Sequence, residues 1–273
     1  MKIYQANNTI NLFWTGGWDS TFRLLQLLLV DKNHVQPYYI MDLKRESMHA
    51  ELKNMKEIRS ILYSNYPYTK ELFRPTIFTK VRDIEKDPVI TNALKTAIKT
   101  THYGSQYDWL ARFCKQNNIL DMEMCAQRIA NPQTAPRLKP FLIKIDGTQI
   151  YKYNVVYANS PEYELFRFYN FPIVEISKLD MLKISNKNGW ENMMTKTWFC
   201  HHPKLGNKPC GKCTPCKQAI SEYLEFRIPL STGLLSKFEE TKFYIFISRV
   251  NNYLKNIVHY IKDSTENTPI SGK

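Results

Sequence analysis

A glycine-rich turn near the N-terminus, in the segment NLFWTGGWDSTF, has the residue types that bind phosphate. It follows an apolar run and precedes a helix-like stretch, so it lies where a strand would pass into a helix. Gly16 and Gly17 lack the Cβ atoms that would keep an anion from the main chain, and Ser20 and Thr21 add hydroxyl donors. A helix N-terminus favours an anion, because its first N–H groups are unpaired and carry the positive end of the helix dipole.

The aspartate of this turn, Asp19, stands where a helix N-cap is wanted, and its carboxylate could also hold Mg²⁺ beside the phosphates. The turn is not a Walker motif, since no Gly-Lys-Ser/Thr follows, and the dinucleotide pattern GxGxxG is absent. On residue types alone, an ordinary strand–helix turn is the alternative. The position directly after an apolar strand favours phosphate binding.

A second cluster with chemical potential lies towards the C-terminus, in CHHPKLGNKPCGKCTPC. Its cysteines have the spacing C-x9-C-x2-C-x2-C and are Cys200, Cys210, Cys213 and Cys216. Two-residue gaps let successive thiolates turn inward on one small loop, and four thiolates make a tetrahedral zinc site. An iron–sulfur cluster is the competing interpretation. His201 and His202 adjoin the first cysteine, but four sulfurs suffice, so we expect them beside the site or at the surface.

Four further residues could take part in chemistry, but each has a simpler interpretation. The lone thiols of Cys114 and Cys125 are expected to be buried and inert. Glu123 and Arg128 lie near the fourth predicted strand, where they could contact a substrate or form ordinary salt bridges.

Length and composition restrict the class of protein. The 273 residues can bury a sizeable core, and 43% hydrophobic residues argue against disorder for most of the chain. No apolar run approaches the roughly 20 residues of a membrane span, and no secretion signal is visible, so a cytoplasmic location is expected. In a reducing compartment, clustered cysteines favour metal binding. The net charge of +13 suits an anionic partner, although a general lysine bias is the alternative.

Hydrophobic periodicity predicts alternating strands and helices that would position both clusters. The predicted strands are 9–14, 35–41, 74–80 and 118–125, and the predicted helices are 20–31, 46–64 and 106–117. This order indicates a parallel sheet covered by helices.

The second half of the chain departs from this alternation. Residues 141–157 form two extended runs around Asp-Gly, which predicts a hairpin leaving the α/β core. Residues 169–189 return to a strand and a helix, and a further helix is expected from about Thr214. Residues 237–262 predict a long amphipathic helix, whose apolar stripe packs on the protein's own core or forms a homodimer contact.

The turn WTGGWDSTF resembles the SGGxDS pyrophosphate loop of the PP-loop ATP pyrophosphatases, also called the adenine nucleotide alpha hydrolase-like superfamily. Thr15 replaces the usual serine and keeps the hydroxyl, and Trp18 fills the free position. The resemblance implies a Rossmann-like (HUP-type) sheet with helices on both faces. It also implies that ATP binds at residues 15–21, with Asp19 and Ser20 at the reacting phosphates, and that AMP passes to a substrate oxygen. Asp42, at the end of the second strand, would lie near the adenosine; a helix N-cap or a solvated turn is the alternative.

Together, the turn and the cysteine segment resemble the 7-cyano-7-deazaguanine synthase family over residues 9–64 and 169–220. The resemblance implies ATP, Mg²⁺ and Zn²⁺ as cofactors. It also implies that 7-carboxy-7-deazaguanine is adenylated and that ammonia gives an amide, then a nitrile. The domains expected are a nucleotide-binding domain over 1–199 and a zinc loop with a helical region over 200–262. A disordered tail would follow at 263–273.

The middle of the chain departs from that family, because the substrate segment GVNxxDxSGYPDCR is absent. Residues 125–168 carry the Asp-Gly hairpin instead. This departure leaves two alternatives open. Relatives in bacterial antiviral systems imply a protein acceptor in place of ammonia, and tRNA-modifying PP-loop enzymes imply a nucleic acid. A nucleotide sensor without catalysis is a further alternative.

Overall fold

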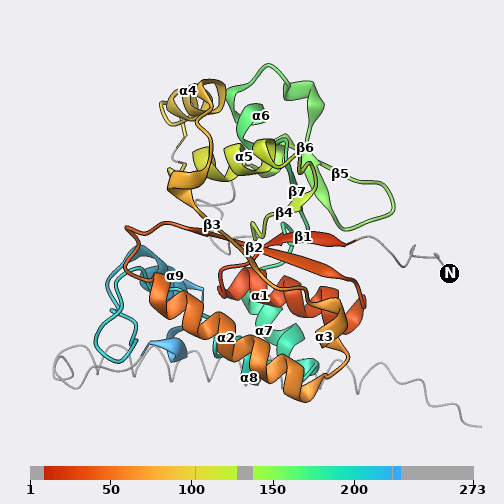
Figure 1. Cartoon of the computed structure of the whole chain (residues 1–273), viewed down its shortest axis with the longest axis vertical. Helices are drawn as coiled ribbons and strands as arrows, with labels where there is room; N and C mark the ends of the chain where they lie inside the picture. Colours follow the sequence, from red (N-terminus) through yellow and green to blue (C-terminus); the bar gives the residue numbers. More distant parts are fainter. Residues whose placement is uncertain (1–8, 102, 128–137, 223, 229–273) are drawn as a thin grey trace, which may run out of the picture. The chain divides into compact units, whose positions relative to one another are not determined.

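The computed structural model describes residues 9–101, 103–127, 138–222 and 224–228 (Figure 1). The described residues belong to one compact unit that ends at Ile228. The predicted helix 237–262 and the tail 263–273 lie outside the described residues, as does Arg128. No helix in the described ranges is both long and apolar enough to cross a membrane.

A seven-stranded sheet runs through the described part of the chain, in the order β3-β2-β1-β4-β7-β6-β5. The strands are β1 (Ile10–Phe13), β2 (Val35–Met41), β3 (Ile77–Lys80), β4 (Met122–Glu123), β5 (Leu142–Lys144), β6 (Tyr151–Tyr153) and β7 (Tyr169–Phe171). The five neighbouring strands β3, β2, β1, β4 and β7 pair in parallel, whereas β6 pairs antiparallel with both β7 and β5. The prediction of an α/β fold with a mostly parallel sheet is therefore confirmed.

Helices follow most of the strands. The α-helices are α1 (Trp18–Leu25), α2 (Met48–Asn65), α3 (Thr69–Leu72), α4 (Pro88–Ala97), α5 (Gln106–Gln116), α6 (Pro161–Phe166), α7 (Lys178–Lys187), α8 (Glu191–Met194) and α9 (Thr214–Ser221). A π-helical segment, η1 (Gln26–Val30), continues α1. Short 3-10 turns are η2 (Val81–Asp83), η4 (Lys139–Phe141), η5 (Val155–Tyr157) and η6 (Glu225–Arg227).

Two cores cover the two faces of the sheet, because successive strand residues point to opposite sides. Leu12 of β1 packs with α1, α2, α7 and α8, whereas its neighbour Phe13 packs with α5. Figure 1 shows α4, α5 and α6 on one side of the strands and α1, α2, α7 and α8 on the other. Tyr39 and Ile40 of β2 divide between the same two cores.

The predicted hairpin forms, but it does not leave the sheet. Gly147 has φ +70°, as a turn glycine does, and the two strands pair in antiparallel register. Tyr151 of β6 then pairs with Phe171 of β7, so the hairpin extends the parallel sheet at its edge. The expectation of a hairpin separate from the α/β core is thus wrong in that respect. Pairing with β6 gives hydrogen-bond partners to backbone groups of β7 that would otherwise lie unpaired at the edge of the sheet. The fourth strand is also shorter than predicted.

Candidate functional site

The glycine turn lies at the point where the strand order reverses. The chain passes from β1 to β2 on one side, while β4 pairs with β1 on the other. In open α/β sheets, ligands bind at the carboxyl ends of the strands at such a switch point. A small cavity of about 190 Å³ lies here, lined by Phe13, Thr15, Gly17, Trp18, Asp19, Ser20 and Cys125. The structure therefore brings five predicted site residues together at one cavity.

The two glycines of the turn have different roles. Gly16 has φ +68°, and an added Cβ would lie 2.9 Å from Met55 Cγ and 3.4 Å from the Glu51 carbonyl oxygen of α2. Gly16 is therefore required by backbone conformation and by the close approach of α2. Gly17 has φ −76°, which any residue adopts, and its added Cβ would lie 3.3 Å from Thr15 Oγ1. Only Gly17 lines the cavity, so only there would a side chain obstruct a ligand.

The N-terminus of α1 presents unpaired donors beside this cavity. Thr21 N–H donates to the Gly17 carbonyl at 3.0 Å and begins the helical pattern. The N–H groups of Trp18, Asp19 and Ser20 precede it and have no partner within the helix. Thr21 is placed differently from its neighbours: its Oγ1 accepts a 3.1 Å bond from the buried Trp14 indole, away from the cavity lining.

Asp19 has an unusual electrostatic environment. Its Oδ1 is buried and has no hydrogen-bond partner among the described residues. Burial raises the pKa of the Asp19 carboxyl from 3.8 to about 6, while the charges of Lys178 and Arg227 lower it and that of Glu222 raises it. An unpaired carboxylate oxygen beside free helix N–H groups is suited to a cation that accompanies a phosphate.

Two basic residues that were not predicted, Lys178 and Arg227, lie close enough to Asp19 for their charges to lower its pKa. The Arg227 guanidinium lies over the rings of Trp18, at 4.9 Å, and Phe199, at 4.5 Å. It also donates to the Thr197 carbonyl at 2.5 Å. Lys178, the first residue of α7, forms a 2.6 Å ion pair with Glu222. Neither residue belongs to a sequence motif shared with the glycine turn. The one local signal is the capping-box serine Ser177, which predicts the start of the helix that carries Lys178.

Asp42 is not among the cavity-lining residues. It follows β2 at the carboxyl edge of the sheet, and its Oδ1 accepts from Lys44 N–H at 3.0 Å. Its carboxylate thus stabilises the turn before α2, which agrees with the alternative of a solvated turn. The N-cap of α2 is Ser47 and not Asp42.

Glu123, weighed as a substrate contact, forms a structural ion pair instead. Its two oxygens accept from Arg23 at 2.8 and 2.9 Å in a buried bidentate pair. This pair joins β4 to α1, and neither residue lines the cavity. Cys114 is buried, as expected. Cys125 is only partly buried and lines the cavity, so the expectation of a buried thiol is wrong there. Burial raises the pKa of both thiols. A raised pKa keeps both thiols protonated at neutral pH.

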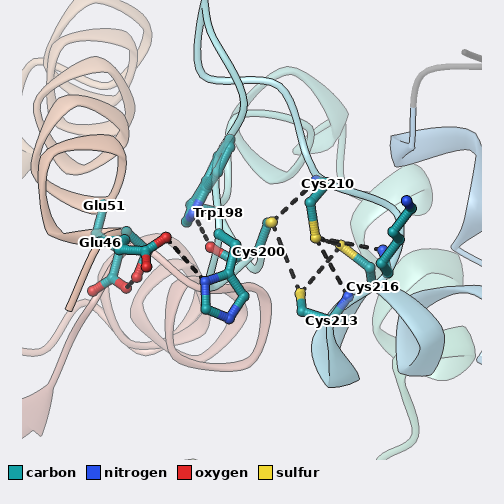
Figure 2. Close-up of polar contacts among 10 residues, drawn as sticks. Glu46, Glu51, Trp198, Cys200, Cys210, Cys213 and Cys216 are labelled. Atoms are coloured by element: carbon teal, nitrogen blue, oxygen red, sulfur yellow. Dashed lines mark hydrogen bonds and ion pairs between the residues drawn. The ribbon is translucent and has the colours of Figure 1, made fainter.

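The four clustered cysteines meet as predicted. Their sulfurs all lie within 4.8 Å of one another, and Figure 2 shows them facing a common centre. Individual Sγ–Sγ distances are 3.8 Å for Cys200–Cys213, 3.5 Å for Cys213–Cys216 and 3.9 Å for Cys210–Cys216. A tetrahedral ion with bonds of about 2.3 Å to four sulfurs would set the sulfurs about 3.8 Å apart. This donor set therefore fits one zinc ion, and a multi-iron cluster would need wider spacing.

Main-chain donors support negative charge on the Cys210 sulfur, whereas burial raises the pKa of the Cys200 and Cys216 thiols. Burial opposes ionisation of Cys210, but N–H groups of Lys212 and Cys213 donate to its sulfur and lower its pKa to about 6. Cys210 N–H in turn donates to Cys200 Sγ at 3.1 Å. The histidines are not part of the cluster: His202 Nδ1 lies 2.9 Å from Glu46 Oε2 at the surface.

Trp198 connects the two clusters. Its main-chain N–H donates to the Gly16 carbonyl at 2.9 Å, and its indole N–H donates to the Cys200 carbonyl at 2.7 Å. The indole lies against the Cys200 main chain in Figure 2. Trp198 is buried and shares a small core with Ala50 of α2 and two of the cysteines. The cysteine segment is thus fastened directly to the glycine turn.

No protein-family model matches this chain, and a search of curated proteins returned no match.

Proposed function

We propose that this chain is an ATP-dependent adenylating enzyme of the PP-loop type, with a Rossmann-like (HUP-type) fold. The observation that carries the proposal is the glycine turn at the switch point, where helix N–H groups and Ser20 border one cavity. Such a site favours the phosphates of a nucleotide. Thr15, Gly17, Trp18, Asp19 and Ser20 would contact ATP, and Gly16 would keep the turn in shape.

The charges around the cavity suit transfer of AMP from ATP to a substrate oxygen that attacks the α-phosphorus. Lys178 and Arg227 would compensate the charge of the phosphates and the leaving pyrophosphate. Asp19 Oδ1, which is buried and unpaired among the described residues, would hold a Mg²⁺ ion bound with ATP. When bound, that ion would neutralise phosphate charge. The chain's own residues would hold the reactants in line, and this positioning supplies much of the rate.

The substrate would present a carboxylate. A carboxylate is a poor electrophile, and adenylation turns one of its oxygens into a leaving group. The carboxylate oxygen would attack the α-phosphorus of ATP and release pyrophosphate, giving an acyl adenylate. Ammonia would displace AMP to form an amide. A second adenylation, at the amide oxygen, and loss of AMP would give the nitrile. The resemblance to 7-cyano-7-deazaguanine synthases selects 7-carboxy-7-deazaguanine as the acid.

A second acceptor is favoured by the rebuilt middle of the chain. The hairpin β5–β6 extends the sheet where the resembling family has its substrate segment. A rebuilt region of this kind suits a different nucleophile, such as an amino group of a protein, while leaving the adenylation unchanged. This is the antiviral-type alternative. The tRNA-modifying alternative would require a nucleic-acid acceptor.

Zinc would have a structural role in this protein. Four sulfurs leave a tetrahedral ion no open position for water or substrate, which is typical of structural sites. Cys200, Cys210, Cys213 and Cys216 would hold it, and Trp198 would transmit its ordering effect to the glycine turn.

The test is turnover with defined substrates. The purified protein is incubated with ATP, Mg²⁺, 7-carboxy-7-deazaguanine and ammonium, and nucleotides and products are separated by chromatography. We expect AMP and pyrophosphate, with amide and nitrile products. If amine-bearing proteins or tRNA are needed for AMP release, the corresponding alternative acceptor replaces ammonia. ADP in place of AMP would refute adenylation.

A further inference from the structure

The loop between the first two cysteines forms a small hairpin with a marked charge. Lys204 and Lys208 pair as an isolated antiparallel bridge, with Lys204 N–H donating to the Lys208 carbonyl at 2.8 Å. Gly206 and Asn207 form the tip with φ of +75° and +55°. Cys200 and Cys210 flank the hairpin, and Cys210 N–H donates to Cys200 Sγ. The hairpin is therefore held at its base by the cysteine cluster.

The paired lysines repel each other. Residues directly opposite in an antiparallel pair have their side chains on the same face, and like charges there are destabilising. Both side chains are exposed, and neither has an ion pair with any other described residue. The segment 195–221 itself contains five lysines and no aspartate or glutamate. The carboxylates that reach it, Glu57 and Glu46, contact Lys196 and His202 and not the paired lysines. An external anion would relieve this repulsion.

The composition of the segment distinguishes between anionic partners. Protein interfaces are enriched in arginine and depleted in lysine, whereas 195–221 has no arginine. A lysine ammonium is a rotatable point charge that fits repeated phosphates without fixed geometry. At the hairpin tip, Leu205 is 97% exposed, and apolar side chains between basic residues are used as wedges against nucleobases.

We propose that this hairpin, defined by Lys204, Leu205 and Lys208, binds the phosphate backbone of a nucleic acid, with Lys212 and Lys217 extending the basic surface. The contact is electrostatic and independent of sequence, with Leu205 packing against a base. This surface is separate from the adenylation cavity, so its test does not depend on the proposed reaction.

The test measures binding of a short fluorescein-labelled single-stranded RNA of mixed sequence by anisotropy, across a range of salt concentrations. Lys204→Glu with Lys208→Glu should weaken binding by roughly tenfold or more at low salt. The salt slope should fall by about 1.4, because each single-strand phosphate contact contributes roughly 0.7. Leu205→Ser should weaken binding without changing the slope.

A matched control is Lys95→Glu with Lys99→Glu, at the end of α4 on the opposite face of the sheet, which changes the net charge equally. It should bind RNA nearly as wild type does. Zinc content and melting temperature report folding, and Lys204→Gln with Lys208→Gln replaces the charge reversal if that variant loses zinc. Equal losses in the hairpin and control variants, or no loss in either, would overturn the proposal. Tighter binding of poly-glutamate than of RNA would overturn it in favour of an acidic protein.

Discussion

The main-chain N–H of Trp198 donates a 2.9 Å hydrogen bond to the carbonyl oxygen of Gly16, joining residues far apart in the chain. The Trp198 indole is bonded at the same time to the carbonyl of Cys200, a predicted zinc ligand. The cysteine cluster and the glycine turn are therefore one structural unit. An ordered metal site should preorganise the turn for ATP.

Removing zinc should therefore weaken ATP binding. A chelator strong enough to strip the cluster is expected to lower ATP affinity several-fold, and added zinc should restore it. Trp198→Phe should act in the same direction, because losing its buried bond to Cys200 costs roughly 1–3 kcal/mol. Trp190→Phe, at another buried tryptophan, is the control. It should leave both the ATP affinity and the zinc affinity close to those of the wild type. Identical ATP affinity with and without metal would refute the coupling. Calorimetry measures both.

The two glycines should respond differently to substitution. Gly16→Ala should destabilise the fold by about 2 to 4 kcal/mol, because its φ is positive and its added Cβ would press on Met55 of α2. Gly17→Val should keep the melting temperature near wild type but lower ATP affinity at least about tenfold, because its side chain would stand at the cavity where phosphate approaches. Thermal denaturation and ATP titration distinguish the two effects. A folded Gly17→Val variant with normal ATP affinity would contradict the phosphate-binding role.

Replacing one clustered cysteine should remove the metal. Cys213→Ala is expected to lose zinc and to unfold or aggregate, since metal binding in such sites contributes on the order of 10 kcal/mol to folding. Cys114→Ala removes a buried thiol outside the cluster and should retain one zinc per chain. Metal analysis and sedimentation measure the outcome. Visible absorbance of the purified protein would instead indicate iron in the four-sulfur site.

The Asp19 carboxyl predicts a pH dependence with a definite sign. Its folded pKa of about 6 exceeds its ordinary 3.8, chiefly because of burial. Its contribution to the unfolding free energy is therefore most favourable below pH 3.8 and falls as the pH rises to about 6. Asp19→Asn should raise the melting temperature relative to wild type at pH 7.5, with a smaller difference at pH 5.

The same substitution should weaken binding of Mg²⁺-ATP, and wild-type affinity should fall as the pH drops below about 6. Asp42→Asn is the control, because that carboxylate caps a turn outside the cavity. It should show neither effect. If the difference in melting temperature between Asp19→Asn and wild type stays constant from pH 5 to pH 7.5, burial does not raise the pKa of the Asp19 carboxyl.

Local patterns predicted much of this fold, and contacts between distant residues explain the remainder. Periodicity located β1, α1, β2 and α2 to within a few residues, and the cysteine spacing correctly predicted a single cluster. Sequence alone missed α4, whose apolar positions lie at helical spacing but follow Asp87 and Pro88 in a weakly patterned region. It also missed Arg227 at the cavity, because its position beside Trp18 depends on the packing of the chain after α9. The role of Gly16 was misjudged for the same reason: its neighbour is α2, which no local motif reveals.

The central claim is attack of a substrate carboxylate on the α-phosphorus of ATP at the Asp19 turn. The most direct measurement uses 7-carboxy-7-deazaguanine with ¹⁸O in its carboxylate, together with ATP, Mg²⁺ and ammonium, and analyses the nucleotide by mass spectrometry. The account predicts AMP that carries one ¹⁸O from the substrate, with unlabelled pyrophosphate, and much less labelled AMP from the folded Gly17→Val variant at an ATP concentration near the wild-type Kd. Unlabelled AMP, or ADP with labelled phosphate, would contradict it.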